Sequence, residues 1–144
     1  VTSRVLKSLF HHLKDKNVDI KGTILKPNMI ISGTNCTEQA GVQEVAEKTV
    51  KCLLENVPED LPGIAFLSGG QSDIDATAHL DAMNKIGGFP WKLSFSYGRA
   101  LQQAALKAWM GKEENMNNAQ AAFSHRALMN KNAALGKWNK DLEN

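Results

Sequence analysis

Residues 63–72 are Gly63-Ile64-Ala65-Phe66-Leu67-Ser68-Gly69-Gly70-Gln71-Ser72, a short apolar run followed by consecutive glycines and a serine. An apolar run of this length, bounded by turn residues, predicts a buried β-strand. Ser72, with Asp75 three residues later, has the spacing of a capping box and predicts the start of a helix that continues to about Ile86. The segment therefore has the pattern of a strand–turn–helix unit.

The same pattern occurs once before and once after this unit. Residues 22–30 are too few for a typical helix and contain Pro27, which favours a strand. Apolar residues at helical spacing follow from Val42 to Leu54. Downstream, residues 91–96 predict a third strand, and Leu101 to Ala108 predict the helix that follows it. Three strands that alternate with helices imply right-handed crossovers and a parallel sheet.

Two further helices are expected, one from Val5 to Leu13 and one from about Glu113 to Ala133. This order fits a small open α/β sheet. It also fits the last three strand–helix units, plus a terminal helix, of a (β/α)₈ TIM barrel, which takes about 250 residues in total. Residue 1 is Val rather than Met, and a helical pattern is already present at Val5, so we expect the chain to begin inside a larger fold.

The composition is that of an ordinary soluble globular protein. The 144 residues are 42% hydrophobic and 22% charged, which suits a single domain spanning residues 1–144. The net charge is +2 and the basic residues are scattered, which argues against nucleic acid or an anionic membrane as a partner. No apolar stretch approaches the ~20 residues that span a bilayer. Cys36 and Cys52 are too few for a disulfide framework, so we expect a reducing, cytoplasmic compartment.

The histidines lack the spacing of metal ligands with acidic or cysteine partners, so we expect neither a metal nor another cofactor. They are interpreted as exposed helix positions. The four are His11, His12, His79 and His125. The tryptophans are interpreted as core or partly buried packing residues. These are Trp91, Trp109 and Trp138.

Lys26 is the candidate nucleophile. Side chains alternate along a strand, so Lys26 shares a face with Ile24 and Asn28 in a run that is otherwise interpreted as buried. A free lysine has a pKa of about 10.4, so only about 0.04% is neutral at pH 7, whereas attack on a carbonyl needs the neutral amine. Burial or a neighbouring cation would lower that pKa. The alternative is a strand-end lysine whose ammonium reaches water along its stem.

The turn after the second strand is a candidate anion-binding site. Gly69 and Gly70 precede a helix, so their backbone N–H groups are open to an anion that the helix dipole also attracts. Ser68 adds a hydroxyl donor. The alternative is a tight turn that uses glycine only for its permissive backbone.

The turn after the third strand has a similar character. Ser96 is followed closely by Gly98, which permits close approach of a ligand, and by Arg99, which offers a fork of donors suited to phosphate. Arg99 could equally cap or pair on a helix surface. In (β/α)₈ barrels the loops after the last two strands often bind phosphate, and Lys26 would lie at the same end of the preceding strand. A lysine beside a phosphate cradle indicates a phosphorylated carbonyl substrate.

Three segments carry a resemblance to the class I (Schiff-base) fructose-bisphosphate aldolases, in the family's order and at close to its spacing. They are Leu25-Lys26-Pro27-Asn28-Met29, Phe66-Leu67-Ser68-Gly69-Gly70-Gln71-Ser72 and Phe95-Ser96-Tyr97-Gly98-Arg99-Ala100-Leu101-Gln102. Ala105-Leu106-Lys107-Ala108-Trp109 also matches. The resemblance covers nearly the whole chain, so the chain is similar to the C-terminal part of a family member.

The resemblance implies a (β/α)₈ barrel, assembled as a homotetramer, that reversibly cleaves fructose 1,6-bisphosphate to dihydroxyacetone phosphate and glyceraldehyde 3-phosphate without a metal. It implies that Lys26 forms the imine with the substrate. It also implies that the substrate phosphate is held by Ser68, Gly69, Gly70, Ser96, Gly98 and Arg99. Binding to cytoskeletal proteins is implied by the same resemblance.

The chain departs from the family pattern in two respects. The family's general acid/base carboxylates belong to earlier barrel strands, and its mobile C-terminal tail ends in tyrosine, whereas this chain stops at Asn144. We therefore expect these residues alone to be inactive. Two rival functions stay open: another Schiff-base sugar-phosphate aldolase or transaldolase-like enzyme, and a non-catalytic module whose glycine turns bind phosphorylated ligands or a protein while Lys26 is structural.

Overall fold

A computed structural model describes residues 1–144, and its centre is a small parallel sheet. The sheet has the order β1-β2-β3, with β1 at Ile24–Leu25, β2 at Gly63–Phe66 and β3 at Lys92–Phe95. Ile64 of β2 is in register with Leu25 on one side and with Leu93 on the other. The predicted parallel α/β arrangement is therefore confirmed.

Helices occupy the segments that the apolar periodicity predicts. The five α-helices are α1 (Thr2–Asp15), α2 (Val42–Asn56), α3 (Asp73–Ile86), α4 (Arg99–Trp109) and α5 (Met116–Ala134). Three short 3₁₀ helices lie at Ile20–Gly22, Glu113–Asn115 and Lys140–Glu143. None of the helices has the length and apolar character needed to cross a membrane.

The boundaries of α3 follow from local chemistry. The hydroxyl of Ser72 accepts a hydrogen bond from the backbone N–H of Asp75 at 3.0 Å, as the predicted cap requires. Asp73 and Asp75 place negative charge in the first turn, where the helix dipole favours it. At the other end, Gly87 has φ +63°, a conformation that glycine adopts at low cost, and the helix stops at Ile86 as predicted.

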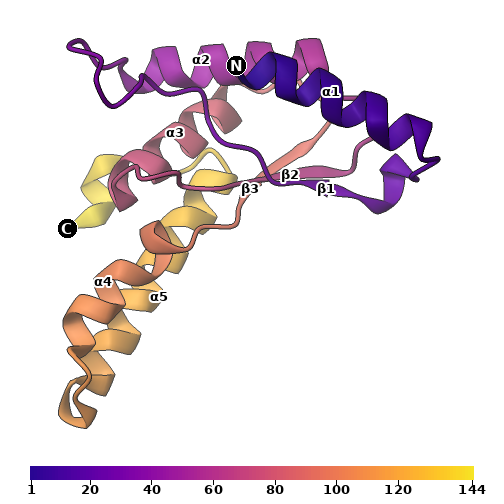
Figure 1. Ribbon diagram of the computed structural model, residues 1–144. Helices are drawn as coiled ribbons and strands as arrows, with labels where there is room; N and C mark the ends of the chain where they lie inside the picture. Colours follow the sequence, from indigo (N-terminus) through magenta and orange to yellow (C-terminus); the bar gives the residue numbers. More distant parts are fainter.

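Helices cover one face of the sheet. Ile64 and Phe66 of β2 and Leu93 of β3 are buried in one hydrophobic core with residues of α2 and α3, and the partly buried Leu25 of β1 packs against that core. Figure 1 shows α2 and α3 on the same side of the strands, whereas α4 and α5 pack together as a hairpin that projects away from the sheet.

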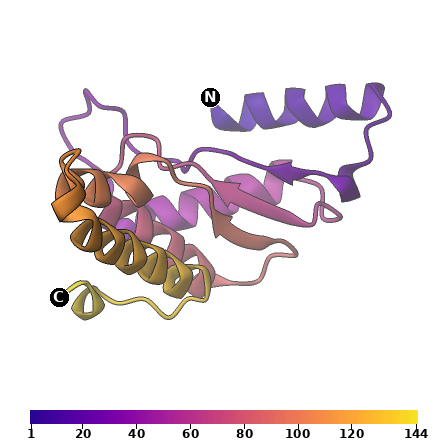
Figure 2. The same cartoon turned by 90° about the horizontal axis from the view of Figure 1, so that it is seen from below.

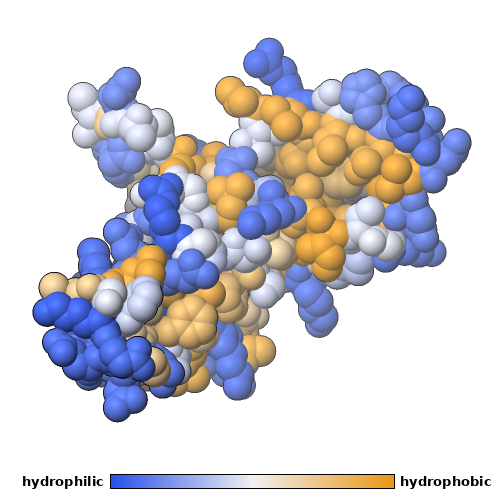
Figure 3. Space-filling model, turned by 60° about the horizontal axis from the view of Figure 1, so that its bottom comes forward, coloured by the Kyte–Doolittle hydropathy of each residue, from blue (hydrophilic) through white to orange (hydrophobic).

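The opposite face of the sheet is bare. Ile24 is 65% exposed, and Lys92, Ser94 and Ser96 are also exposed. Figure 2 shows the strands from this side, with α2 behind them. Figure 3 turns the underside of Figure 1 toward the viewer and shows a broad hydrophobic area over the part of the molecule that carries α1 and the sheet. Apolar surface of this extent is usually buried against another element.

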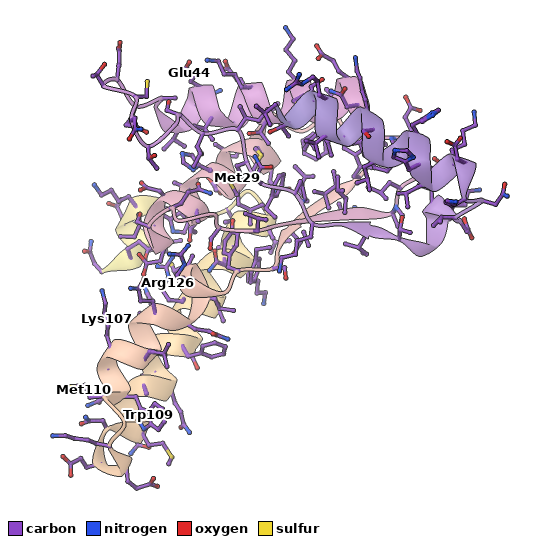
Figure 4. All side chains as sticks on the ribbon, viewed as in Figure 1. Met29, Glu44, Lys107, Trp109, Met110 and Arg126 are labelled. Carbon is purple, nitrogen blue, oxygen red and sulfur yellow. The ribbon has the colours of Figure 1, made fainter.

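One expectation is wrong in detail. The strand expected within residues 22–30 shrinks to two residues, because Pro27 has no N–H to donate to the ladder and β1 lies at the edge of the sheet. Trp109, expected in the core or partly buried, is 44% exposed near the tip of the α4–α5 hairpin, where Figure 4 labels it. Trp91 and Trp138 are buried as expected.

A buried arginine holds the C-terminal segment against the rest of the fold. Arg126 of α5 is 3% exposed and lies between α3 and α5 (Figure 4). Its guanidinium pairs with Glu143, donates to the hydroxyl of Thr77 at 2.6 Å and donates to the carbonyl of Asp73 at 3.1 Å. The indole N–H of Trp138 donates to the other carboxylate oxygen of Glu143 at 2.8 Å. No pattern in the sequence indicates this role of Arg126.

Replacing Arg126 should therefore be strongly destabilising. Arg126→Ala leaves the carboxylate of Glu143 enclosed without its cation, so we expect the free energy of unfolding to fall by about 3–5 kcal/mol. Urea unfolding followed by circular dichroism measures this change. Lys131→Ala, at an exposed position of the same helix, is the control and should change stability by less than about 0.5 kcal/mol. A loss at Arg126 as small as that of the control would contradict the assignment.

Candidate active site

The ends of the three strands meet at one edge of the sheet. Parallel pairing continues beyond the strands themselves, since the N–H of Leu67 donates to the carbonyl of Pro27 at 3.0 Å and the N–H of Ser96 donates to that of Phe66 at 2.8 Å. The segments that begin at Lys26, Leu67 and Ser96 therefore lie side by side at the carboxyl ends of β1, β2 and β3.

Lys26 lies on the bare face of the sheet. It is exposed, and so are Ile24 and Asn28, which share its face by alternation along the chain. The expectation that this run is buried is wrong for this face, because no part of residues 1–144 covers it; Pro27 and Met29, on the other face, are buried. The amine of Lys26 has no carboxylate partner.

The turn after β2 presents free backbone donors. The carbonyl of Ser68 accepts from the N–H of Gln71 at 3.0 Å, which closes a tight turn. Gly69 and Gly70 lie inside it with φ +50° and +83°, a region that side-chain-bearing residues rarely adopt. Their N–H groups donate to no acceptor within the protein, and the hydroxyl of Ser68 has no partner either.

Arg99 reaches the same turn from α4. A Cβ at Gly70 would lie 3.8 Å from Nη2 of Arg99, so the guanidinium is adjacent to the glycine turn. Gly98 precedes α4, and its carbonyl accepts from the N–H groups of Leu101 and Gln102 while its own N–H is free. The structure thus brings Gly69, Gly70 and Arg99 together, with Ser68 and Gly98 in the same two turns.

Ser96 and Lys26 flank this cluster on the bare face. Ser96 is exposed and its hydroxyl makes no hydrogen bond in the protein. By the strand register, Lys26 is level with Ala65, and Ser68 lies three residues farther along the chain, a displacement of roughly 10 Å at ~3.3 Å per residue. The amine of Lys26 and the free donors of the turn after β2 therefore lie within reach of one small molecule.

His79 contradicts the expectation of exposed histidines. It is only 7% exposed, and its Nδ1 lies 2.5 Å from Oε1 of Gln71. Burial lowers the pKa of His79, and the charge of Asp75 opposes that shift. The signal for its burial was present in the sequence, since Ala76, Leu80 and Met83 lie three or four residues away on the same helical face. His11 and His12 are exposed as expected.

Glycine turns at the carboxyl ends of parallel strands are typical of phosphate-binding sites in α/β folds. The family model described as fructose-bisphosphate aldolase class I matches residues 1–144. The chain therefore belongs to the class I fructose-bisphosphate aldolase family.

Curated relatives agree with this family. A probable class 1 fructose-bisphosphate aldolase of Xylella fastidiosa is 57% identical over 139 residues, which are 96% of this chain and 42% of that protein. Fructose-bisphosphate aldolase 1 of Toxoplasma gondii is 50% identical over 138 residues, covering 96% of this chain and 38% of the relative. The chain thus spans about two fifths of the length of these relatives.

A solved structure of an aldolase is also similar to this chain over most of its length. Fructose-bisphosphate aldolase from Plasmodium falciparum, crystallised in complex with TRAP and a small-molecule inhibitor, superposes with a TM-score of 0.93 at 43% identity. The match covers 96% of this chain and 40% of that chain. The three-stranded sheet and its helices therefore have the arrangement of part of an aldolase.

The buried histidine predicts a pH dependence of stability. The unfolded chain binds a proton at His79 near pH 6.5, whereas the folded chain binds it only at lower pH because the pKa is lowered. Acid therefore favours the unfolded state, so this contribution is complete above about pH 6.5 and is lost as the pH falls below it. We expect the unfolding midpoint of the wild type to drop between about pH 7 and pH 5 more steeply than that of His79→Asn. His11→Asn, at an exposed position, is the control and should leave the slope of the unfolding midpoint against pH as it is in the wild type. Equal slopes for the wild type and His79→Asn would contradict the prediction.

Proposed function

We propose that this chain is the part of a class I fructose-bisphosphate aldolase that forms the imine with the substrate and binds its phosphate. The reaction is the reversible cleavage of fructose 1,6-bisphosphate to dihydroxyacetone phosphate and glyceraldehyde 3-phosphate. The observation that carries the proposal is the position of Lys26 beside two glycine turns and Arg99 at one edge of the sheet. Membership of the aldolase family supports it.

Lys26 supplies the covalent chemistry in this proposal. Its neutral amine attacks the ketose carbonyl, water leaves, and the protonated imine accepts the electron pair released when the C3–C4 bond breaks. The C4 hydroxyl loses its proton to a base as glyceraldehyde 3-phosphate leaves. Protonation of the remaining carbanion at C3 and hydrolysis of the imine then return the amine and release dihydroxyacetone phosphate. Enclosure of the bare face would favour the neutral amine, because burial disfavours the charged form.

The two turns bind the phosphate. The free N–H groups of Gly69, Gly70 and Gly98 point to an anion site, and the guanidinium of Arg99 lies next to Gly70 without a carboxylate partner. The hydroxyls of Ser68 and Ser96 add donors from the two adjacent strand ends. Donors that converge in this way hold a dianion by charge-assisted hydrogen bonds.

The sheet is proposed to be the last three strands of a (β/α)₈ barrel. The outer edges of β1 and β3 are unpaired and one face is bare, which is what strands cut from a closed barrel would leave. The general acid/base groups would then come from the remaining strands. We also propose a homotetramer and a cytoplasmic location, in line with the cytosolic aldolase 4 of Arabidopsis thaliana, which is 47% identical. Binding of cytoskeletal proteins is part of the same proposal. The aldolase of Plasmodium falciparum crystallised with TRAP shows only that a family member can bind another molecule of that name.

Trapping of the imine tests the proposed chemistry. Sodium borohydride added to the full-length enzyme that contains this chain, in the presence of dihydroxyacetone phosphate, should fix a reduced adduct on Lys26, because the imine is reduced to a stable amine. Peptide mass mapping locates the adduct. Lys26→Ala should abolish cleavage and trapping, whereas Lys107→Ala, at an exposed position of α4, should retain both.

The rival functions give different results in the same experiments. Faster cleavage of an unrelated sugar phosphate than of fructose 1,6-bisphosphate would assign another Schiff-base aldolase. Full activity of a folded Lys26→Ala enzyme would remove Lys26 as the nucleophile and favour a phosphate- or protein-binding module.

The 144 residues alone should be inactive and should self-associate. Two unpaired strand edges and the exposed apolar side chains of α1 and β1, such as Val5, Leu9 and Ile24, offer surfaces to other copies. Sedimentation velocity should show species larger than the 15.8 kDa monomer, and a coupled assay should detect no cleavage. A monomeric chain that cleaves fructose 1,6-bisphosphate, in a preparation free of other aldolases, would overturn this prediction.

A further inference from the structure

A chain of polar contacts lies behind the glycine turn and plays no part in the reaction as described. Gln71 is its centre. The backbone N–H of Gln71 donates to the carbonyl of Ser68 at 3.0 Å, and its side-chain Nε2 donates to the same carbonyl at 2.9 Å. Nε2 also lies 3.7 Å from Sδ of Met29, a buried residue of the segment that follows Lys26. Gln71 therefore fixes the Ser68 carbonyl twice and contacts both halves of the proposed site.

His79 of α3 determines the orientation of Gln71. Nε2 of Gln71 donates to the carbonyl of Ser68, so Oε1 of Gln71 is the atom that faces His79. An amide oxygen can only accept a hydrogen bond. The 2.5 Å contact then requires a proton on Nδ1 of His79, which leaves Nε2 of the neutral ring as an acceptor. Burial lowers the pKa of His79 and so favours this neutral state.

Glycines make such a support necessary. Gly69 and Gly70 adopt positive φ angles here, but glycine has many other accessible backbone conformations. Their N–H groups therefore converge on one point only when contacts from neighbouring residues fix the turn. The Ser68 carbonyl is the first anchor of that turn, and Gln71 is the residue that closes it. A cleft of about 510 Å³, lined by Gly69, Gly70, Gln71 and His79 among others, runs beside the turn. Packing alone therefore does not hold the turn on that side.

We propose that His79 is a positioning residue for phosphate binding: it orients the Gln71 amide, which holds the Ser68 carbonyl and thereby aims the N–H groups of Gly69 and Gly70 at the phosphate. The role deepens the proposed function and rests on it. His79 contacts no substrate and takes no proton in the reaction.

The test compares two substitutions of His79 in the full-length enzyme that contains this chain. His79→Leu places an apolar side chain in the buried site and removes the donor to Gln71. His79→Asn keeps a donor, because the asparagine amide nitrogen occupies nearly the place of Nδ1. Loss of one such hydrogen bond corresponds to about a three- to tenfold loss of affinity. The dissociation constant of inorganic phosphate, measured by calorimetry, and the KM for fructose 1,6-bisphosphate should both rise by that factor in His79→Leu and by less than about twofold in His79→Asn.

The kinetic pattern separates positioning from general damage. Because the phosphate is bound in both ground and transition states, kcat should stay within about twofold of the wild type in both variants. His11→Leu, at an exposed position, is the control and should change neither constant. Equal phosphate affinity in the wild type and a folded His79→Leu enzyme would overturn the proposal, as would a His79→Asn enzyme that is as weak as His79→Leu.

A substitution of Gln71 tests whether His79 acts through it. Gln71→Leu alone should weaken phosphate binding at least as much as His79→Leu, and the double variant should be no weaker than Gln71→Leu, because the two residues form one chain of contacts. Additive losses would overturn the proposal. If His79→Leu does not fold, the phosphate dissociation constants of the other two variants test the proposal. It predicts a three- to tenfold rise in Gln71→Leu and a rise of less than about twofold in His79→Asn, and any other result would overturn it.

The binding measurement does not depend on turnover. A wild-type enzyme that binds phosphate but does not cleave fructose 1,6-bisphosphate would refute the proposed reaction, and the role of His79 would then be judged from the phosphate dissociation constants alone. A wild-type enzyme that binds no phosphate would refute both.

Discussion

Strands that run in the same direction cannot be joined by tight turns, so each requires a crossover, and in this chain α2 and α3 form those crossovers on one side of the sheet. Lys26, Ser68 and Ser96 are far apart in sequence, yet each follows the carboxyl end of a neighbouring strand for this reason. The same geometry leaves the other face of the sheet uncovered. The parallel pairing of the strands thus brings the candidate site residues together. It also makes the site depend on the element that covers the other face of the sheet.

Polar groups enclosed within the fold specify the arrangement around this edge. Arg126 and His79 lie on different helices; Arg126 donates to Thr77 and to the carbonyl of Asp73, and His79 contacts the amide oxygen of Gln71. Burial of such groups costs free energy, which their hydrogen bonds offset only when every partner is in place. Their contribution is therefore to select one packing of α3, α5 and the glycine turn over other packings of similar apolar content.

Local signals in the sequence were enough to predict the strand–helix units, the cap at Ser72 and the end of α3 at Ile86, because these depend on residues close together in the chain. They were also enough to place the candidate residues on consecutive strand ends. The short length of β1 and the burial of His79 were missed. Both had a local signal that was not used, in Pro27 and in the apolar residues that share the helical face of His79. The proximity of Arg99 to the turn at Gly70 was not predictable, because it depends on where α4 starts relative to a neighbouring strand.

The contacts that α3 makes with the C-terminal part of the chain have a consequence for the order of folding. Thr77 bonds to Arg126 and Asn130, which are 49 and 53 residues farther along, and the carboxylate of Asp81 accepts from the backbone N–H of Trp138, 57 residues away. During synthesis α3 leaves the ribosome before any of these partners exists. Contacts of such sequence separation form late and slowly, so a nascent chain passes through a stage in which the strands can pair while the buried polar side of α3 is still hydrated.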